Sequence, residues 1–550
     1  MSQILILIFF YFLILYSIIG YGRVFTLFNS NYQVSSFDGL LGIAILILIS
    51  YVTNIFFAHN FLHNSLIISL GLLIFIYDFI KNFSKRISEY KDLSIIFIII
   101  FIAILMYKNH DDFFYYHFSY THILTNFEKV FGLGNLNHGF RTPSSIFYLN
   151  SLFYLPIIKY YLMNSGAAYI LGFSNYILLN NIRDSIKKNN LNHILFLSIL
   201  SLVYINTVFP RIAEHGTDRS ALILVFVMSV YYLKSIDFKK DELNNNYFNY
   251  FYSKLALLFA IIISLKSFYI IYLIIFLLWF IQIKRFYNLN TLISLIFKNY
   301  YTYLILLFFS FTIFTIFTNT GCLIYPATFT CFDQFSWSIS LAQVDQMQLW
   351  YEQWSKAGAS PNFRIDDPQL YVSKLNWVGN WFKMYFFTKV SDNIFSTALI
   401  TSIVFFLFSY KCSKTIKVTY NNNYKLFYYL ILILFFEWFY NHPALRYGGY
   451  TLLALIFFIP TSFYLSRFKF DPPTLKKKIY FILLLTLLVF ITRNVLRINK
   501  EVKQYGYNPI KKAFFHLKEN PFTLYDMVEV LYENHKIKDK GFLIIKNNNK

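Results

Sequence analysis

The chain has 550 residues, of which 57% are hydrophobic and only 14% are charged, and its mean hydropathy is +0.48. A soluble protein cannot bury that much apolar surface, and the composition also excludes a disordered chain, a collagen, a coiled coil and a disulfide scaffold. The formal net charge of +22 is scattered in short clusters between apolar runs. Such clusters orient helices in membranes, and no basic helix stands apart from them, so we expect no nucleic-acid partner.

Uncharged apolar segments recur along most of the chain and predict an all-α, polytopic transmembrane bundle of about 14 helices. The segment from Ser94 to Tyr107, for example, contains no charged residue. The first segment lacks the basic start and the small-residue cleavage site of a signal peptide, so we expect it to remain as a helix. The predicted spans are centred near Phe10, Leu48, Leu72, Ile99, Leu171, Leu200, Val227, Ala260, Ile275, Ser310, Val404, Leu432, Phe457 and Leu485.

Loops rich in Lys and Arg alternate with loops that contain fewer basic residues, and this alternation predicts the orientation of the bundle. By the positive-inside rule, the basic loops face the cytoplasm. The loops expected to face outward are 109–155, 210–220, 319–393 and 441–449. The alternation holds only if Ser145 to Leu155, flanked by Pro143 and Pro156, does not cross the membrane but dips into or lies along its outer surface as a short separate helix. The tail from Arg497 is then an outer appendage, with helices expected around 509–520 and 523–534.

The unusual polar clusters all lie in the predicted outer loops, and the first of them is a pair of carboxylates. Asp111 and Asp112 follow the fourth span directly. Two adjacent carboxylates at a membrane exit repel one another, so one of them can have a raised pKa suited to a general base. The pair is equally a candidate site for a divalent cation. The alternative is an acidic interfacial loop without a chemical role.

Basic and mixed clusters follow in the later outer loops. Arg141 comes after a glycine-rich turn and can grip a phosphate or anchor at lipid headgroups. Lys266 lies at an outer helix turn, where it can bind a lipid phosphate or extend to ordinary headgroups. Arg446 precedes two glycines, and its planar guanidinium is suited to clamping a phosphate. A polar island, which suits either a sugar site or a self-neutralising hairpin, contains Glu214, His215, Asp218 and Arg219.

The large outer loop holds aromatic residues and two cysteines. Five of the seven tryptophans fall in it, and they can stack on sugar faces or form an ordinary aromatic belt. Cys322 and Cys331 share an oxidising compartment in this topology, so we expect a disulfide that closes a short loop. Cys412 is expected on the cytoplasmic side, where it stays reduced.

Taken in order, these residues resemble the GT-C class of membrane glycosyltransferases. In that class an aspartate opens the first large outer loop, short surface helices follow, and later basic residues hold the phosphate of a lipid-linked donor. Asp111 and Asp112 match the aspartate position, and Arg446 is a plausible match to a late basic residue. Further motifs are similar to an uncharacterised bacterial family of GT-C type over roughly Ile95 to Phe468; they are Gly134-Asn-Leu, Ser144 to Asn150, Gly321 to Trp337, Trp354-Ser and Pro443 to Arg446. No signature in this sequence fixes which carboxylate acts.

The resemblance implies an inverting glycosyltransferase of the bacterial inner membrane with its active site on the outer face. It would move a sugar from a polyprenyl-phosphate donor, drawn from among the membrane lipids, to a glycan, lipid or protein acceptor. One alternative is an envelope polysaccharide polymerase or ligase, for which arginines would be essential and the two aspartates dispensable. Another is a lipid or solute transporter, which would need ionisable residues deep within its helices.

The chain then divides into five predicted parts. Residues 1–92 form additional N-terminal helices, 93–317 a GT-C-like core with its first outer loop at 108–163, 318–395 the large outer loop, 396–495 the C-terminal transmembrane helices, and 496–550 an outer soluble tail.

Overall fold

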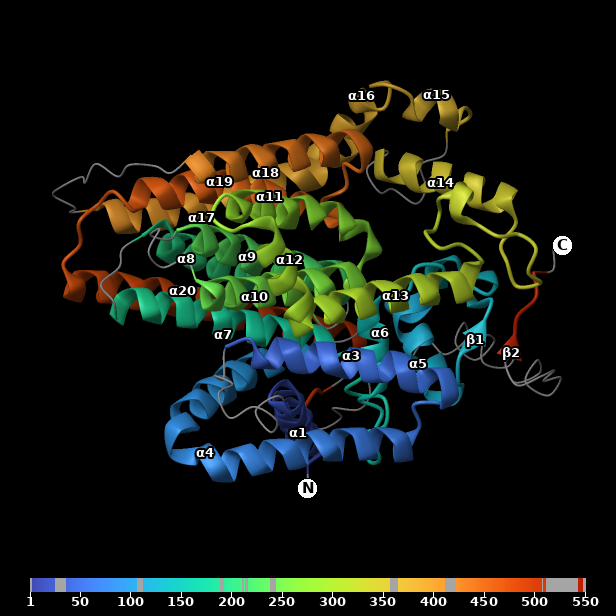
Figure 1. Cartoon of the computed structure of the whole chain (residues 1–550), viewed down its shortest axis with the longest axis horizontal. Helices are drawn as coiled ribbons and strands as arrows, with labels where there is room; N and C mark the ends of the chain where they lie inside the picture. The colour runs from blue at the N-terminus through green and yellow to red at the C-terminus, as the bar shows by residue number, and fades with distance from the viewer. Residues whose placement is uncertain are drawn as a thin grey trace.

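The computed structural model describes residues 2–24, 36–105, 112–187, 192–209, 212, 216–237, 244–356, 365–410, 422–506, 508–510 and 543–547. Within these residues the chain forms 19 α-helices and one sheet of two short strands (Figure 1). The prediction of an all-α helical bundle is therefore confirmed. Asp111, Glu214, His215 and Cys412 lie outside the described residues, as do most of the predicted tail helices.

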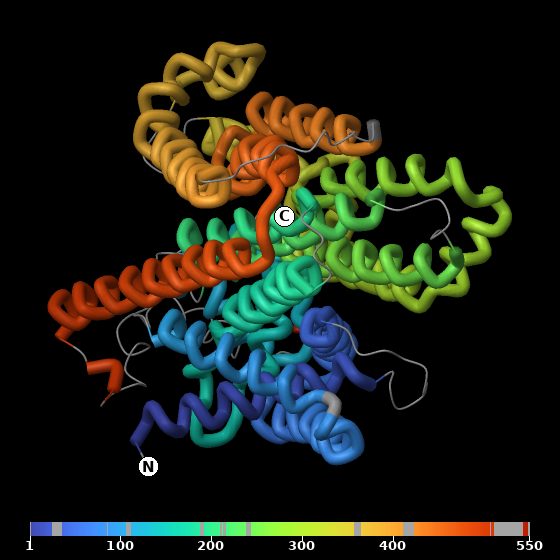
Figure 2. Tube along the Cα trace, turned by 90° about the vertical axis from the view of Figure 1, so that its left-hand side faces the viewer, coloured from blue at the N-terminus to red at the C-terminus, as the bar shows by residue number. Residues whose placement is uncertain are grey.

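Chain order divides the long helices into three groups; Figure 2 shows the first in blue at the bottom, the second in teal and green in the middle and at the right, and the third in orange at the top and red at the left. The first group is α1 (Gln3–Gly22), α3 (Asp38–Phe56) and α4 (Phe61–Ile104), and α4 bends at Asn82, whose backbone is not helical. The second is α7 (Gly166–Lys187), α8 (His193–Thr207), α9 (Gly216–Ile236), α10 (Asn245–Leu265), α11 (Leu273–Lys284) and α13 (Tyr300–Thr320). The third is α17 (Ser391–Ser409), α18 (Asn422–Asn441), α19 (Gly449–Leu465) and α20 (Pro472–Tyr505).

Shorter helices connect the three groups. Those before α13 are α5 (Phe118–Asn126), α6 (Ser145–Ser151) and α12 (Leu289–Lys298). Those after α13 are α14 (Leu341–Lys356), α15 (Pro368–Val372) and α16 (Val378–Trp381), which lie together at one end of the bundle (Figure 1).

Nine helical segments in the described part of the chain are long and apolar enough to cross a membrane, so the chain is a multi-pass membrane protein. Each predicted span centre lies in a helix, but the predicted count of about 14 spans differs from these nine. Leu72 and Ile99 both belong to the bent helix α4. Helices α8 and α19 have only 15 and 17 residues, and polar side chains such as Asn181 and Glu437 lower the hydropathy of α7 and α18.

The exposed surface of the outer helices is apolar, as a lipid-facing surface must be. Leu62, Leu66, Leu70 and Leu73 of α4 share one face at spacings of three or four residues and are 51–72% exposed. Helix α9 is the opposite case, because 89% of its apolar window is buried inside the protein. A helix that is apolar all round and buried belongs at the centre of the bundle.

The predicted surface helix from Ser145 to Leu155 is corrected by the structure. A short separate helix does form there, capped by the side chain of Ser144, but it is α6 and every one of its residues is buried. Its apolar side chains, Ile146, Phe147 and Leu149, point in different directions around the helix and leave no wetted face. Helix α6 therefore packs against α3 and α5 within the fold.

The end of the chain returns to the first predicted outer loop. Strand β2 (Leu543–Ile544) pairs in parallel with β1 (Val130–Phe131), and both lie beside the α14 end of the bundle in Figure 1. Helix α20 continues to Tyr505, beyond the residue at which the soluble tail was predicted to begin.

Candidate functional site

Four charged residues from separate parts of the chain meet at one end of the bundle, and we call them the Arg446 cluster. Asp112 directly precedes the π-helical turn η1 (Phe113–His117), and Asp218 lies in the first turn of α9. Lys266 follows the last residue of α10. Arg446 lies in the short turn η8 (Leu445–Tyr447) between α18 and α19. The sequence analysis named each of these residues, and the fold brings them together.

Asp218 is the centre of the cluster. Its Oδ2 accepts a hydrogen bond from Nε of Arg446 at 2.9 Å, and its Oδ1 lies 3.0 Å from Nζ of Lys266. The Asp218 side chain is only 10% exposed. A buried carboxylate needs cationic partners, and here it has two. Asp218 therefore holds both cations in place.

Asp112 approaches a different nitrogen of the same guanidinium. Its Oδ2 lies 3.9 Å from Nη1 of Arg446, and both side chains are more exposed than Asp218, at 28% and 30%. Burial alone would lower the pKa of Arg446, but the carboxylates of Asp218 and Asp112 help to raise it well above its ordinary value. Arg446 is therefore a permanent cation, and part of its side chain is exposed at the protein surface.

The local backbone explains how Arg446 is held in position. Gly448 has φ of +113°, in the left-handed region that favours glycine, and a Cβ there would lie 2.8 Å from the hydroxyl oxygen of Tyr272. The hydroxyl of Tyr269 donates a hydrogen bond to the carbonyl oxygen of Arg446 at 2.7 Å. The turn is thus fixed by glycine on one side and by a tyrosine on the other.

Aromatic rings line the cluster. The guanidinium carbon of Arg446 lies 5.5 Å from the centre of the Trp354 ring, and Nζ of Lys266 lies 5.7 Å from that of Tyr447. Trp350 lies one helical turn before Trp354 on α14, with the two ring centres 6.5 Å apart. Trp350 is 43% exposed. Cations beside aromatic faces form the kind of surface that receives a sugar phosphate.

The other tryptophans of the large loop have different surroundings. Trp377 and Trp381 are buried, and Nε1 of Trp381 donates to the carbonyl oxygen of Pro443 at 2.9 Å. Trp337 stacks on Phe335, with ring centres 4.6 Å apart. Trp354 is thus the tryptophan whose ring lies against Arg446.

Two other predicted site residues, Arg141 and Arg219, are not members of the Arg446 cluster. Arg141 donates to the carbonyl oxygen of Gly134 at 3.1 Å and to the hydroxyl of Tyr325 at 2.8 Å, so it joins the segment before α6 to the loop after α13. Arg219 follows Asp218 in α9, so its side chain leaves the helix about 100° around the axis from that carboxylate. Among the described residues, no group of three or more His, Cys, Asp or Glu side chains is placed to hold a metal ion.

Residues 1–453 match the family described as a domain of unknown function, DUF8201. The chain belongs to the DUF8201 family. The DUF8201 match begins at residue 1, so it includes the three predicted spans that precede Ile95, and it also includes every residue of the Arg446 cluster. No curated protein and no solved structure matches the chain.

Cys322 and Cys331 are joined by a disulfide, as the shared compartment predicted. The bond closes a loop with a sequence separation of 9 residues, directly after α13. We expect both thiols to resist alkylation without reductant and the Cys322→Ser/Cys331→Ser variant to lose about 2 kcal/mol of local stability. Mass spectrometry after alkylation of the purified protein measures whether the two cysteines are protected. Full alkylation of both cysteines without reductant would contradict the pairing.

A buried ionic network near the first helices was not predicted from the sequence. Arg23, which follows α1 and is fully buried, donates to Asp78 at 2.9 Å and to Glu89 at 2.8 Å, both on α4. Asp38, at the start of α3, lies 3.6 Å from the same guanidinium. Removal of one partner from such a network is strongly destabilising, so it ties the three N-terminal helices together. In the sequence, the one sign of this network was a single arginine at the end of an apolar segment.

Lys129 is a second buried charge that the sequence did not reveal. It is 4% exposed, and its Nζ donates to the hydroxyl of Tyr148 at 3.3 Å. Burial lowers the pKa of Lys129 from 10.5 to about 7. Since the unfolded chain keeps the ordinary pKa, it binds the proton more tightly than the folded chain, and stability rises as pH increases from about 7 towards 10.

Replacement of Lys129 by Met should therefore stabilise the protein near pH 7, by an amount on the order of a few kcal/mol. The gain should decline as the pH rises from 7 towards 10, because the folded chain then holds a neutral lysine and the unfolded chain also begins to lose the proton. Melting of purified protein in detergent at pH 7, 8.5 and 10 measures the effect. The exposed Lys298→Met serves as the control, and an equal gain for Lys129→Met at all three pH values would reject the burial argument.

Proposed function

We propose that this protein is an inverting membrane glycosyltransferase that uses a polyprenyl-phosphate sugar donor on the outer face of a bacterial inner membrane. The observation that carries the proposal is the 3.9 Å approach between Asp112, at the start of the first outer loop, and Arg446, on a late loop. The GT-C resemblance implies that an aspartate and a basic residue from these two positions share one site.

The residues of the cluster divide into two chemical roles under this proposal. Asp112, partly exposed, accepts the proton of the acceptor hydroxyl while that oxygen forms a bond to the anomeric carbon of the sugar. The bond from the anomeric carbon to the donor phosphate breaks at the same time, and the phosphate leaves with the electron pair. Arg446 and Lys266 stabilise the charge that develops on the departing phosphate.

The remaining residues position these groups. Asp218 orients both cations, because each of its carboxylate oxygens faces one of them. Trp354 and Tyr447 supply aromatic faces beside the cations, which is where the apolar face of a sugar can rest. The acceptor, which is a glycan, a lipid or a protein, approaches the more exposed Asp112.

Two alternatives make different demands on the same residues. A polysaccharide polymerase or ligase needs the arginines but not Asp112. A transporter needs ionisable groups deep within the bundle, and the buried Lys254 of α10 is one observation in its favour. A transporter, however, makes no chemical use of a carboxylate next to Arg446.

The direct test is sugar transfer by the full chain reconstituted in liposomes that contain polyprenyl-phosphate sugars. We expect loss of the donor and formation of free polyprenyl phosphate when a lipid or glycan acceptor is present. Movement of the intact donor across the bilayer without bond cleavage would instead identify a transporter. Growth of one glycan by blocks of several sugars would identify a polymerase.

A further inference from the structure

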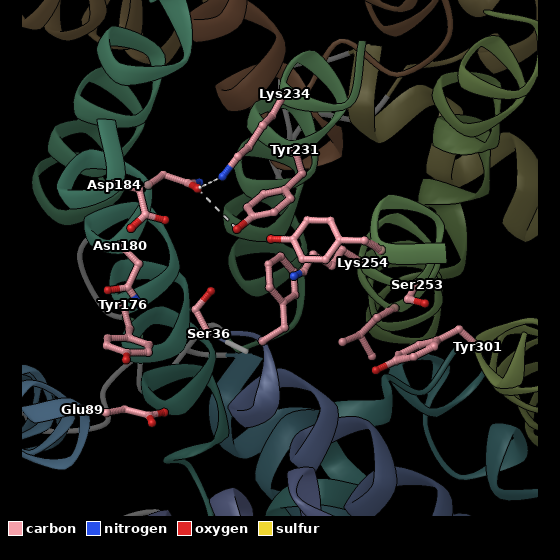
Figure 3. A pocket seen from close by; sticks show the side chains of 14 residues that line it. Ser36, Glu89, Tyr176, Asn180, Asp184, Tyr231, Lys234, Ser253, Lys254 and Tyr301 are labelled. Carbon is pink, nitrogen blue, oxygen red and sulfur yellow. Dashed lines mark hydrogen bonds between the residues drawn. The ribbon is translucent and has the colours of Figure 1, made fainter. Parts of the chain in front are cut away.

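A polar cavity lies at the end of the bundle opposite the Arg446 cluster. It has a volume of about 510 Å³ and is lined by residues of α7, α9 and α10 (Figure 3). Asp218 and Lys234 lie near opposite ends of α9, and the 1.5 Å rise per residue separates them by about 24 Å. The cavity is therefore distinct from the Arg446 cluster, and we call it the Lys254 cavity. Its volume is in the range of small-molecule sites.

Lys254 is the unusual residue of this cavity. It lies within an apolar span of α10, yet it lines the cavity and is only 6% exposed. Its Nζ lies 3.5 Å from the ring centre of Tyr250, 5.1 Å from that of Phe37 and 5.9 Å from that of Tyr231. Within the described part of the chain, Nζ of Lys254 has neither an ion pair nor a hydrogen bond.

A buried ammonium group beside aromatic rings has lost part of its hydration. Ring faces attract a cation, but they do not neutralise it or accept its three N–H donors as strongly as an anion does. Asp38 acts on Lys254 from a longer distance, and that carboxylate already lies 3.6 Å from Arg23. An ionisable side chain within a span indicates a functional site, and here the missing complement is an anion.

The surrounding groups define the anion. Lys234, near the end of α9, supplies a second ammonium group that points into the same space, and it donates to Oδ1 of Asn181 at 2.8 Å (Figure 3). Ser36 and Ser253 add hydroxyl donors to the wall. Ammonium, hydroxyl and amide donors around one space are the groups that bind phosphate oxygens.

The acidic residues of the wall limit the charge of the ligand. Glu89 is bound to Arg23 at 2.8 Å, so its charge is already compensated. Asp184 is exposed at the rim, where it repels a ligand of high negative charge. Two lysines and one remaining carboxylate match the charge of a single phosphate group, and not that of a nucleoside triphosphate.

We propose that the Lys254 cavity binds one phosphate group, carried by a membrane lipid headgroup or free in solution, with Lys254 and Lys234 as its cationic ligands. Basic pockets between transmembrane helices are known to receive lipid headgroups. Tyr250, which lines the cavity, is 46% exposed, so the site has an opening at the surface of the bundle. This site does not depend on the chemistry proposed for the Arg446 cluster.

The test compares the melting of the full chain in detergent with three additives: phosphatidylethanolamine, diacylglycerol with the same acyl chains, and inorganic phosphate. The wild-type protein should be stabilised by the phospholipid, by inorganic phosphate or by both, and diacylglycerol should have little effect. Stabilisation by inorganic phosphate alone identifies the free anion as the ligand. Stabilisation by the phospholipid alone identifies the headgroup. Equal stabilisation by phospholipid and diacylglycerol, with none by phosphate, would overturn the proposal.

The variant Lys254→Met keeps the length and apolar stem of the side chain but removes its charge. We expect it to bind the phosphate-bearing additive about tenfold or more weakly, since one charge-assisted hydrogen bond is lost. Lys284→Met, which removes an exposed lysine from the same end of the bundle, should bind like wild type. Unchanged binding by Lys254→Met would contradict the assignment.

A measurement on the wild-type protein covers the case in which Lys254→Met does not fold. Phosphatidylethanolamine with a photoreactive group on its head should crosslink to the segment of α10 around Ser253, and inorganic phosphate or unlabelled phospholipid should compete. Crosslinks confined to other helices, or crosslinks at α10 that neither competitor reduces, would reject the site.

Discussion

Asp112→Asn is expected to reduce sugar transfer by about 10²- to 10⁴-fold, the usual effect of removing a catalytic base. Asparagine keeps the size of the side chain and its ability to form hydrogen bonds, but it cannot accept the proton of the acceptor hydroxyl. Asp112 is 28% exposed, and its distance of 3.9 Å from Arg446 is long for an ion pair, so the fold should tolerate the change. Initial rates of transfer in liposomes measure the loss, with the melting midpoint as a check on folding.

Asp345→Asn is the matched control for this experiment. Asp345 is an exposed carboxylate on α14, which also carries Trp354, and its replacement makes the same chemical change near the same end of the protein. We expect it to keep the rate of the wild type. If Asp112→Asn is as active as Asp345→Asn, while Asp111→Asn is inactive, the base is the neighbouring residue. If the Asp111→Asn/Asp112→Asn variant is also active, the polymerase and transporter alternatives move ahead.

The sequence was sufficient to place the cluster on one side of the membrane but not to join its members. The alternation of basic loops predicts that Asp112, Asp218, Lys266 and Arg446 all lie in outward loops, because loop charge follows from the position of each loop relative to the bilayer. The pairing of Asp218 with Arg446 spans 228 residues and depends on how α9 packs beside the α18–α19 turn. No local pattern records such a contact.

The sequence could not predict the position of residues that contact several helices at once. Trp354 and Trp377 look alike in the sequence, yet one contacts Arg446 and the other is fully buried against Phe439. The buried location of α6 was missed because its length and flanking prolines fit a surface helix equally well. Lys254 offered a visible signal, a lone lysine before a long uncharged segment of α10. The signal was overlooked because basic residues near it follow the positive-inside rule.

Arg446→Lys tests the other half of the proposed mechanism, the stabilisation of the leaving phosphate. Lysine preserves the charge, so Asp218 keeps two cationic partners and the fold should lose little stability. It cannot donate through Nε to Asp218 and through its other nitrogens to a phosphate at the same time, which the planar guanidinium does. The loss of one or two charge-assisted hydrogen bonds, about 1.5–3 kcal/mol each, predicts a decrease of at least about tenfold in kcat/KM.

The control for Arg446→Lys is Arg183→Lys, which alters an arginine that also bonds a carboxylate, that of Asp92, but far from the Arg446 cluster. Arg183→Lys should leave transfer unchanged. A decrease in kcat for Arg446→Lys with little change in KM would mean that the guanidinium acts mainly on the departing phosphate, because interactions made only in the transition state affect turnover. A rise in KM alone would mean that Arg446 holds the donor without assisting bond cleavage. Unchanged kcat and KM would remove Arg446 from the site, and Lys266, the remaining cation on Asp218, would then be the residue left to bind the phosphate.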